Sequence, residues 1–291
     1  MDLKRYLVIF GLALLAFGCG SPKVLTSYKS DAATFEASGN YAKATEAWIN
    51  YFNQTPVEEV AGADFAAGAK TAYKGESNDL ALGWFDQARY KNYSDAEMYK
   101  IMANIYGSVN NLSKELSALE FFTENFGEGD PDVNARLFEI YFEIDSYEQA
   151  LDAWSKMDDA SKNVEASLSN YFIINKKLEN TAVCDSVSMA LLEKNPEQMD
   201  ALKYNAKKYY WRGENRYQKE LAKYEKNKTN KQYKILLKEL EVASADLKKS
   251  LLYLEKIWKV EKEKEFASYF ASIYGRFGDE KKSKYYQGFM K

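Results

Sequence analysis

The sequence predicts an all-α protein built from repeated pairs of short helices. Two observations lead to this prediction: apolar side chains recur at helical spacing, and the same pattern returns several times along the chain. The clearest pair lies between Pro131 and Met157, where two amphipathic segments flank the turn EIDSY. A helical hairpin of this size cannot bury its apolar face alone, so it must stack on similar hairpins. Aromatic residues make up 15% of the chain and only four prolines occur, a composition that favours packed helices over disorder.

The hairpins share a skeleton with a small residue in each second helix. Units begin near residues 25, 62, 96, 131 and 165, at spacings of 34 to 37 residues. The small residue, Ala150 in the clearest unit, lets the two helices approach closely. The same skeleton is present in the first unit as Phe35, Gly39, Tyr41, Ala44, Trp48 and Pro56.

This pattern resembles the tetratricopeptide repeat, whose period is about 34 residues. The resemblance covers nearly all of the chain after residue 24 and implies a right-handed helical solenoid in which each hairpin touches only its neighbours. Two residues depart from the family pattern. Glu115 stands where the second helix of the third unit should carry a small residue. Phe138 likewise replaces the small residue expected in the first helix of the fourth unit.

The sixth unit carries an insertion. Its first helix begins normally at DALKYNAKKYY, but the matching second helix arrives 32 residues late. The intervening chain keeps helical spacing on both sides of EKNKTNKQ, where Thr229 or Asn230 would cap the returning helix. We therefore expect one extended antiparallel helical hairpin, an arm at about residues 211–250, with Gly213 where the arm leaves the body. The whole solenoid would contain about seven hairpins over residues 25–291.

The first residues read as a targeting signal. Lys4 and Arg5 precede an apolar run of 12 residues, which is too short for a comfortable membrane span. Gly18 directly before Cys19 resembles the lipobox of bacterial lipoproteins, which implies cleavage after residue 18 and lipid on Cys19. Residues 19–24 would then form the lipidated N-terminus and a short tether. The expected location is the cell envelope, on the periplasmic face of the outer membrane or on the cell surface. An ordinary secretory signal or an uncleaved anchor is the alternative.

The residue inventory argues against catalysis. The chain contains no histidine, which excludes Ser-His and Cys-His catalysis and removes the commonest metal ligand. Cys184 occupies the close-packing position of its helix and is expected to be a small buried residue. We therefore expect no enzyme activity, no cofactor and no metal site. With 40 Lys and Arg against 43 Asp and Glu, no net field favours nucleic acid as a partner.

The family resemblance places a binding surface on the solvent-facing side of the first helices, on the concave face. Lys100 and Asn104 match positions that hold a terminal carboxylate in some tetratricopeptide clamps, but only Arg136 could supplement them. The aromatics Tyr210, Trp211 and Phe142 are better candidates for binding anchors, unless they pack on the next repeat. The complete predicted surface is Lys70, Tyr73, Lys100, Asn104, Glu139, Phe142, Ile173, Lys176, Lys177, Lys203, Lys207, Tyr210 and Trp211.

The expected tip of the arm is rich in lysine. Only Glu220 and Glu225 oppose its positive charge between residues 219 and 234. A solvated helix tip is one interpretation, and a docking surface for an acidic partner or anionic lipid headgroups is the other. The lysines are Lys219, Lys223, Lys226, Lys228, Lys231 and Lys234.

Taken together, these patterns predict a lipid-anchored scaffold of the cell envelope that binds a protein or peptide partner in an adaptor or assembly role. The alternative is a glycan- or nutrient-capture lipoprotein that pairs with an outer-membrane transporter. Such proteins usually carry loop-rich insertions, whereas the one insertion here is helical in pattern. A purely structural spacer would leave the concave face without aromatic anchors.

Overall fold

The computed structural model describes residues 22–127 and 129–290, and within these ranges the chain forms fifteen α-helices, one short 3-10 helix and no β-strand. The predicted all-α fold of tetratricopeptide-like hairpins is confirmed. The predicted signal peptide and Cys19 lie outside the described residues. The first helix, α1 (Pro22–Ala37), begins at a proline, whose missing N–H costs nothing at a first helical position. Residues 22–24, expected to be part of a tether, are therefore helical.

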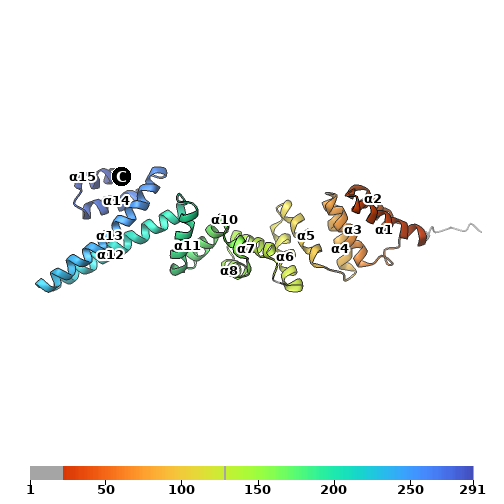
Figure 1. The fold of residues 1–291 in the computed structure, drawn as a ribbon, viewed down its shortest axis with the longest axis horizontal. Coiled ribbons are helices and arrows are strands. Elements are labelled where there is room, and N and C mark those ends of the chain that lie inside the picture. Colours follow the sequence, from red (N-terminus) through yellow and green to blue (C-terminus); the bar gives the residue numbers. More distant parts are fainter. Residues whose placement is uncertain (1–21, 128, 291) are drawn as a thin grey trace, which may run out of the picture. The chain divides into compact units, whose positions relative to one another are not determined.

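Helices joined by short turns form successive hairpins (Figure 1). A single-turn helix, α9 (Asp159–Lys162), and a terminal 3-10 turn, η1 (Gly288–Met290), lie outside this scheme. The pairs are α1 with α2 (Tyr41–Gln54), α3 (Gly62–Lys74) with α4 (Asn78–Tyr90), α5 (Ala96–Ser108) with α6 (Leu112–Phe126), α7 (Pro131–Glu143) with α8 (Tyr147–Lys156), α10 (Glu165–Lys177) with α11 (Thr181–Lys194), α12 (Met199–Lys226) with α13 (Asn230–Val260), and α14 (Lys264–Arg276) with α15 (Glu280–Gln287).

The short hairpin turns share one backbone conformation. Each contains a residue with positive φ, such as Gly39 at 73° or Asp145 at 58°. The N–H of the following residue then bonds a carbonyl five residues earlier, as Asn40 does to Phe35 at 2.8 Å, which closes a Schellman-type turn. The same bond recurs in Ser77 to Ala72, Asn111 to Tyr106, Ser146 to Tyr141, Asn180 to Asn175, and Asp279 to Tyr274. The repeat is therefore visible in the backbone conformation of the turns as well as in the pattern of side chains.

The small residues of the second helices lie where the sequence predicts close packing. Ala44, Ala81 and Ala150 are fully buried, and Cys184 is buried as expected. Glu115, the departure from the pattern, is also buried. It fits because Gly107 faces it: a Cβ at Gly107 would lie 3.0 Å from the Glu115 carboxylate.

Phe138, the other departure, is buried, and its ring centroid lies 5.1 Å from that of Trp154. A large residue in the first helix is thus accepted where the second helix supplies an aromatic partner.

Contacts divide the chain into two compact units at the Val133–Asn134 bond, within α7. In the first unit, stacked rings of Phe52 and Phe65 join α2 to α3, with a centroid distance of 4.7 Å. In the second unit, an apolar cluster joins α12, α13 and α14 through residues that include Leu202, Leu247 and Phe270.

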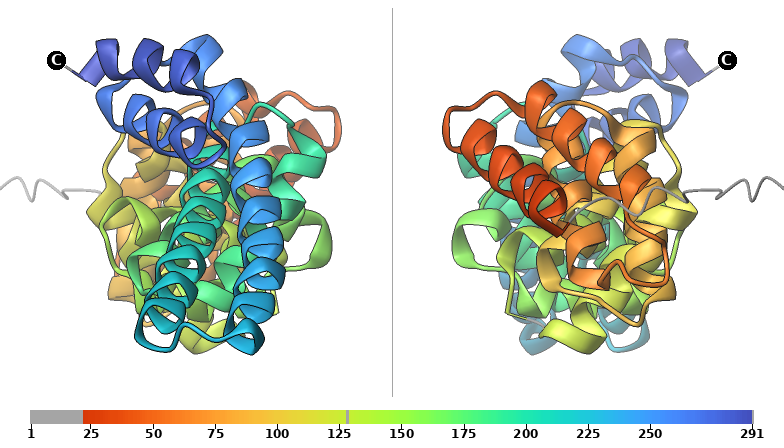
Figure 2. Two further views of the ribbon diagram at one scale, coloured as in Figure 1. Left: turned by 90° about the vertical axis from the view of Figure 1, so that its left-hand side faces the viewer. Right: turned by 90° about the vertical axis from the view of Figure 1, so that its right-hand side faces the viewer.

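The extended hairpin of α12 and α13 is confirmed, and the two long helices run side by side in the left view of Figure 2. Thr229 caps α13, because its side chain accepts the N–H of Gln232. Gly213 lies where the two helices pack tightly: a Cβ there would lie 2.9 Å from both the Ala243 carbonyl oxygen and Leu247 Cγ. The glycine therefore permits close approach of the helices.

Candidate partner-binding surfaces

In the first unit, the predicted binding lysines form ion pairs between successive hairpins. Lys70 Nζ on α3 lies 2.9 Å from the Asp95 carboxylate, which caps α5, and 2.8 Å from Glu97. Lys100 on α5 lies 2.7 Å from Asp130, just before α7. Each lysine thus pairs with an acidic residue at the start of the first helix of the following hairpin.

The surroundings of Asp95 and Asp130 favour the ionised form of both carboxyl groups. Burial opposes ionisation of Asp95, but hydrogen bonds from Lys70 and the Met98 N–H outweigh it, so its pKa is lowered. The pKa of Asp130 is lowered in the same way against the cost of burial, by Lys100 and the Val133 N–H. Lys70 and Lys100 therefore form ion pairs that connect successive repeats.

A groove of about 230 Å³ lies along the first helices of this unit. Glu36 projects into it and accepts hydrogen bonds from Trp48 Nε1 at 3.4 Å and from Thr71 Oγ1. Lys29 and Lys70 also line the groove, but each is paired, Lys29 with Asp64 at 2.7 Å. These paired charges weaken the hypothesis that the concave face clamps a terminal carboxylate.

The same pairing rule holds in the second unit. Lys203 on α12 lies 2.5 Å from Glu261, before α14, and Lys207 lies 2.7 Å from Glu265 on α14. The hydrogen bond to Glu261 raises the pKa of Lys203 in spite of partial burial. Here too, lysines on the first helix of one hairpin pair with acidic residues near the start of the first helix of the following hairpin.

Tyr210 and Trp211 differ sharply although they are neighbours. For Tyr210 the alternative of packing on the next repeat holds: the side chain is 7% exposed, and its hydroxyl donates to Ser272 Oγ on α14 at 3.0 Å. The ring packs on Tyr269 at a centroid distance of 4.4 Å. Trp211 is 49% exposed and meets Tyr210 edge-on at 5.0 Å. The exposed Trp211 indole thus packs on the rings of Tyr210 and Tyr269.

The side chain of Tyr269 is fixed by burial and by a hydrogen bond. Burial and a 2.9 Å hydrogen bond to Glu265 raise its pKa to about 12, so the hydroxyl stays protonated. Glu265 also binds Lys207, which links the platform to the rim of the surface. We call Trp211, Tyr210, Tyr269, Lys207 and Glu265 the Trp211 surface.

The remaining predicted residues do not gather into one site. Tyr73, Phe142 and Ile173 are half-buried, whereas Asn104, Lys176 and Lys177 are exposed. Glu139 is exposed and accepts a bond from Arg136 at 2.9 Å.

At the tip of the arm, Lys223 pairs with the buried Glu220. The other predicted tip lysines are exposed and make no ion pair within the described residues: Lys219, Lys226, Lys228, Lys231 and Lys234.

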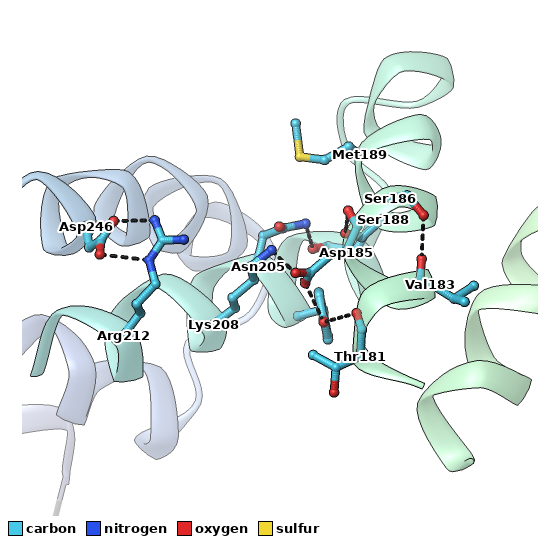
Figure 3. Close-up of polar contacts among 12 residues, drawn as sticks. Thr181, Val183, Asp185, Ser186, Ser188, Met189, Asn205, Lys208, Arg212 and Asp246 are labelled. Carbon is cyan, nitrogen blue, oxygen red and sulfur yellow. Dashed lines mark hydrogen bonds and ion pairs between the residues drawn. The ribbon is translucent and has the colours of Figure 1, made fainter. Parts of the chain in front are cut away.

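Sequence reasoning missed a polar network that joins α11, α12 and α13 (Figure 3). Asp185 accepts from the Tyr204 hydroxyl at 2.7 Å and pairs with Lys208 at 2.6 Å. Arg212 makes a two-pronged pair with the buried Asp246 of α13. The signal was present, since Lys208 and Arg212 lie four residues apart on α12.

Sequence reasoning also missed a pocket of about 370 Å³ among α4, α5 and α6. Tyr99 and Phe121 stack in its wall at 4.1 Å, and Arg89 and Lys114 lie at its edge. Tyr99 is buried and Phe121 is half-buried, so the stacked pair combines a core residue with one that reaches the pocket.

The described residues hold no group of three or more His, Cys, Asp or Glu placed to bind a metal ion. No described helix is both long and apolar enough to cross a membrane.

No protein-family model matches the sequence, and no curated protein matches it. Several solved structures are similar. A tetratricopeptide repeat protein from Parabacteroides merdae is 11% identical, with 92% of this chain and 93% of that chain covered and a TM-score of 0.46. The C-terminal part of a repeat protein from Cytophaga hutchinsonii is 17% identical, with coverage of 91% and 82% and a TM-score of 0.37. A repeat protein from Bacteroides fragilis is 15% identical, with coverage of 88% and 97% and a TM-score of 0.36. The tetratricopeptide-like character of this chain follows from its own recurrent turns and close-packed second helices.

Proposed function

We propose that this chain is a non-catalytic scaffold that binds a protein partner through the Trp211 surface. The observation that carries the proposal is the exposure of the Trp211 indole on a rigid support. Tryptophan is among the residues that dominate binding energy at interfaces, usually at a well-packed centre with a polar rim. Here Tyr210 and Tyr269 supply the packed support, and the Lys207–Glu265 pair supplies the rim.

Rigidity favours binding at this surface. Association costs less free energy when the contact residues are already ordered. The Tyr210 bond to Ser272 and the Tyr269 bond to Glu265 hold both rings before any partner arrives. A partner would bury the indole without first ordering its base.

Affinity capture tests the Trp211 surface. Full-length protein carrying Trp211→Ala should lose a protein partner that the unchanged chain retains. Tyr90→Ala is the matched control, because Tyr90 is 80% exposed on α4 and lies outside the surface. Retention of every partner by Trp211→Ala would contradict the proposal, and so would equal loss in both variants.

The absence of catalysis is part of the proposal. Its support is the chain's lack of histidine and the use of Asp95, Asp130 and Glu265 in pairs that join repeats.

The cell envelope is the proposed location, with lipid on Cys19 as the anchor. Its support is the sequence signal alone: a basic start, a short apolar run and Gly18 before the cysteine. Growth with an alkyne fatty acid should label the chain, and Cys19→Ser should abolish the label. A label that survives the substitution would contradict the anchor, and the matched Cys184→Ser variant should keep it.

A further inference from the structure

Helix α13 carries a second seam in addition to the one that faces α12. The inner seam is buried and includes Leu236, Ala243, Leu247, Leu254 and Ile257. The outer seam recurs at alternating spacings of three and four residues, the periodicity of helix–helix packing. Its members are Ile235, Lys238, Val242, Ala245, Lys249 and Leu252.

The outer seam is open to solvent. Ile235 and Val242 are each 40% exposed and Leu252 is 64% exposed, while Ala245 is exposed between them. A small alanine at mid-seam allows another helix to approach closely. From residue 235 to residue 252 the seam is roughly 26 Å long at 1.5 Å per residue, enough for several turns of a partner helix.

The seam carries Lys238 and Lys249 and no carboxylate, and helix α13 as a whole is positively charged. Helix α13 contains seven lysines and four carboxylates, and two of the carboxylates are already taken by arginines of α12. Asp246 binds Arg212, and Glu239 binds Arg216. Only Glu241 and Glu255 remain to balance the lysines of the helix, and no lysine of α13 makes an ion pair among the described residues.

The seam lies on the side of the hairpin that carries Tyr209, where the Lys249 ammonium sits 5.4 Å from the Tyr209 ring. Tyr253 stacks on the same ring at 5.9 Å, and its hydroxyl lies 3.9 Å from Met189 Sδ on α11. Trp211, by contrast, contacts Tyr269 of α14. The seam is therefore separate from the Trp211 surface.

We infer that the outer seam of α13 docks an acidic amphipathic helix of a partner protein. Aliphatic side chains of such a helix would pack on Ile235, Val242 and Leu252, and its carboxylates would pair with Lys238 and Lys249 of the seam. This arrangement combines burial of apolar area with opposite charge along the edges of the seam.

Two other occupants fit less well. A second copy placed symmetrically on this face would bring lysine against lysine. A bilayer surface is usually met by aromatic as well as aliphatic residues, and the seam itself contains no Trp, Phe or Tyr.

The test uses full-length protein in detergent and a synthetic three-heptad peptide. The peptide has Leu and Ile at the seam positions and Glu at the flanks, and its reversed-charge partner has Lys in place of Glu. We expect the acidic peptide to bind in fluorescence anisotropy, with an affinity that falls as salt rises, and the basic peptide not to bind.

Variants locate the contact. Val242→Glu should weaken binding of the acidic peptide by about tenfold or more, because it puts a like charge at the centre of the seam. Leu237→Glu is the matched control, since Leu237 is 46% exposed on the same helix but outside the seam. It should change the affinity by less than about twofold. The melting temperature of each variant shows whether the hairpin remains folded.

Several results would overturn the inference: no binding of the acidic peptide, equal binding of the basic peptide, or equal damage from Leu237→Glu. Binding to phosphatidylglycerol vesicles without binding to the peptide would assign the seam to a membrane instead. Trp211→Ala should leave peptide binding unchanged, so the seam and the Trp211 surface stand or fall separately.

Discussion

At the scale of single residues, Lys70 and Lys100 show that a side chain facing solvent in a repeat pattern can serve the fold itself. Their partners are Asp95 and Asp130. Asp95 accepts the N–H of Met98 at 2.9 Å, and Asp130 accepts the N–H of Val133 at 3.2 Å. Each carboxylate thus caps the start of one helix and binds the lysine of the previous hairpin.

The two roles of Asp95 can be separated by substitution. Asp95→Asn keeps a capping oxygen and loses the ion pair, so we expect a loss of about 0.5 kcal/mol. Asp95→Ala removes both and should cost about 1–2 kcal/mol. Urea unfolding followed by circular dichroism measures the difference. Equal losses in the two variants would show that the cap contributes nothing.

Glu214 predicts a dependence on pH. The side chain is 9% exposed and binds Arg276, with Arg276 Nε at 3.1 Å, and Gln218 at 2.8 Å. Burial opposes ionisation, but these bonds lower its pKa below the ordinary value. A lowered folded-state pKa stabilises the fold above the unfolded-state pKa, about 4.3, and this contribution is lost as pH falls through the folded-state value.

Glu214→Gln should therefore lower the free energy of unfolding by about 1–3 kcal/mol at neutral pH, and by progressively less below about pH 4. Urea midpoints measured from pH 7 downward test this. Glu280→Gln, in an exposed pair with Lys284, is the control and should show no such trend. A deficit that stays constant with pH would contradict the assigned pKa.

Sequence reasoning stopped short at Tyr210 and Trp211. Both were candidates for binding anchors unless they packed on the next repeat, and adjacent residues on a helix point about 100° apart. Only the placement of α14 decides which of the two is covered, and α14 lies more than fifty residues away in the chain.

At the scale of elements, the extended hairpin was predictable and its two seams were not. Apolar residues at helical spacing on both sides of EKNKTNKQ were enough to predict two long helices. However, Tyr233 is 47% exposed although it lies three residues before the buried Leu236, at helical spacing. The inner and outer seams differ by one residue in register, and periodicity alone does not say which of them is buried.

Gly213 tests the packing of the hairpin. Alanine is normally the better helix former by about 1 kcal/mol. Gly213→Ala should nevertheless lower the melting temperature, because the new Cβ would meet Ala243 O and Leu247 Cγ at 2.9 Å.

Gly83→Ala is the matched control. Gly83 lies inside α4, and a Cβ there meets nothing within 4 Å. This variant should raise the melting temperature. Stabilisation by both substitutions would mean that α12 and α13 are less closely packed than described.

At the scale of the whole molecule, charge is unevenly distributed along the chain. Residues 211–260 contain 13 Lys and Arg against 7 Asp and Glu, although the complete chain has a net charge of −3. The rest of the chain is therefore acidic, and some of its lysines, such as Lys70 and Lys100, pair with carboxylates of the next hairpin. The net charge of the complete chain hides this contrast.

Two surfaces of the second unit, the Trp211 surface and the outer seam of α13, are proposed to contact protein partners. The most direct measurement is photo-crosslinking of the full chain in living cells, with a photoreactive residue in place of Trp211 or Val242. Tyr90 and Leu237 provide the control positions. We predict discrete crosslinked protein bands from positions 211 and 242, and none from 90 and 237. The same bands from all four positions, or none from 211 and 242, would contradict the account.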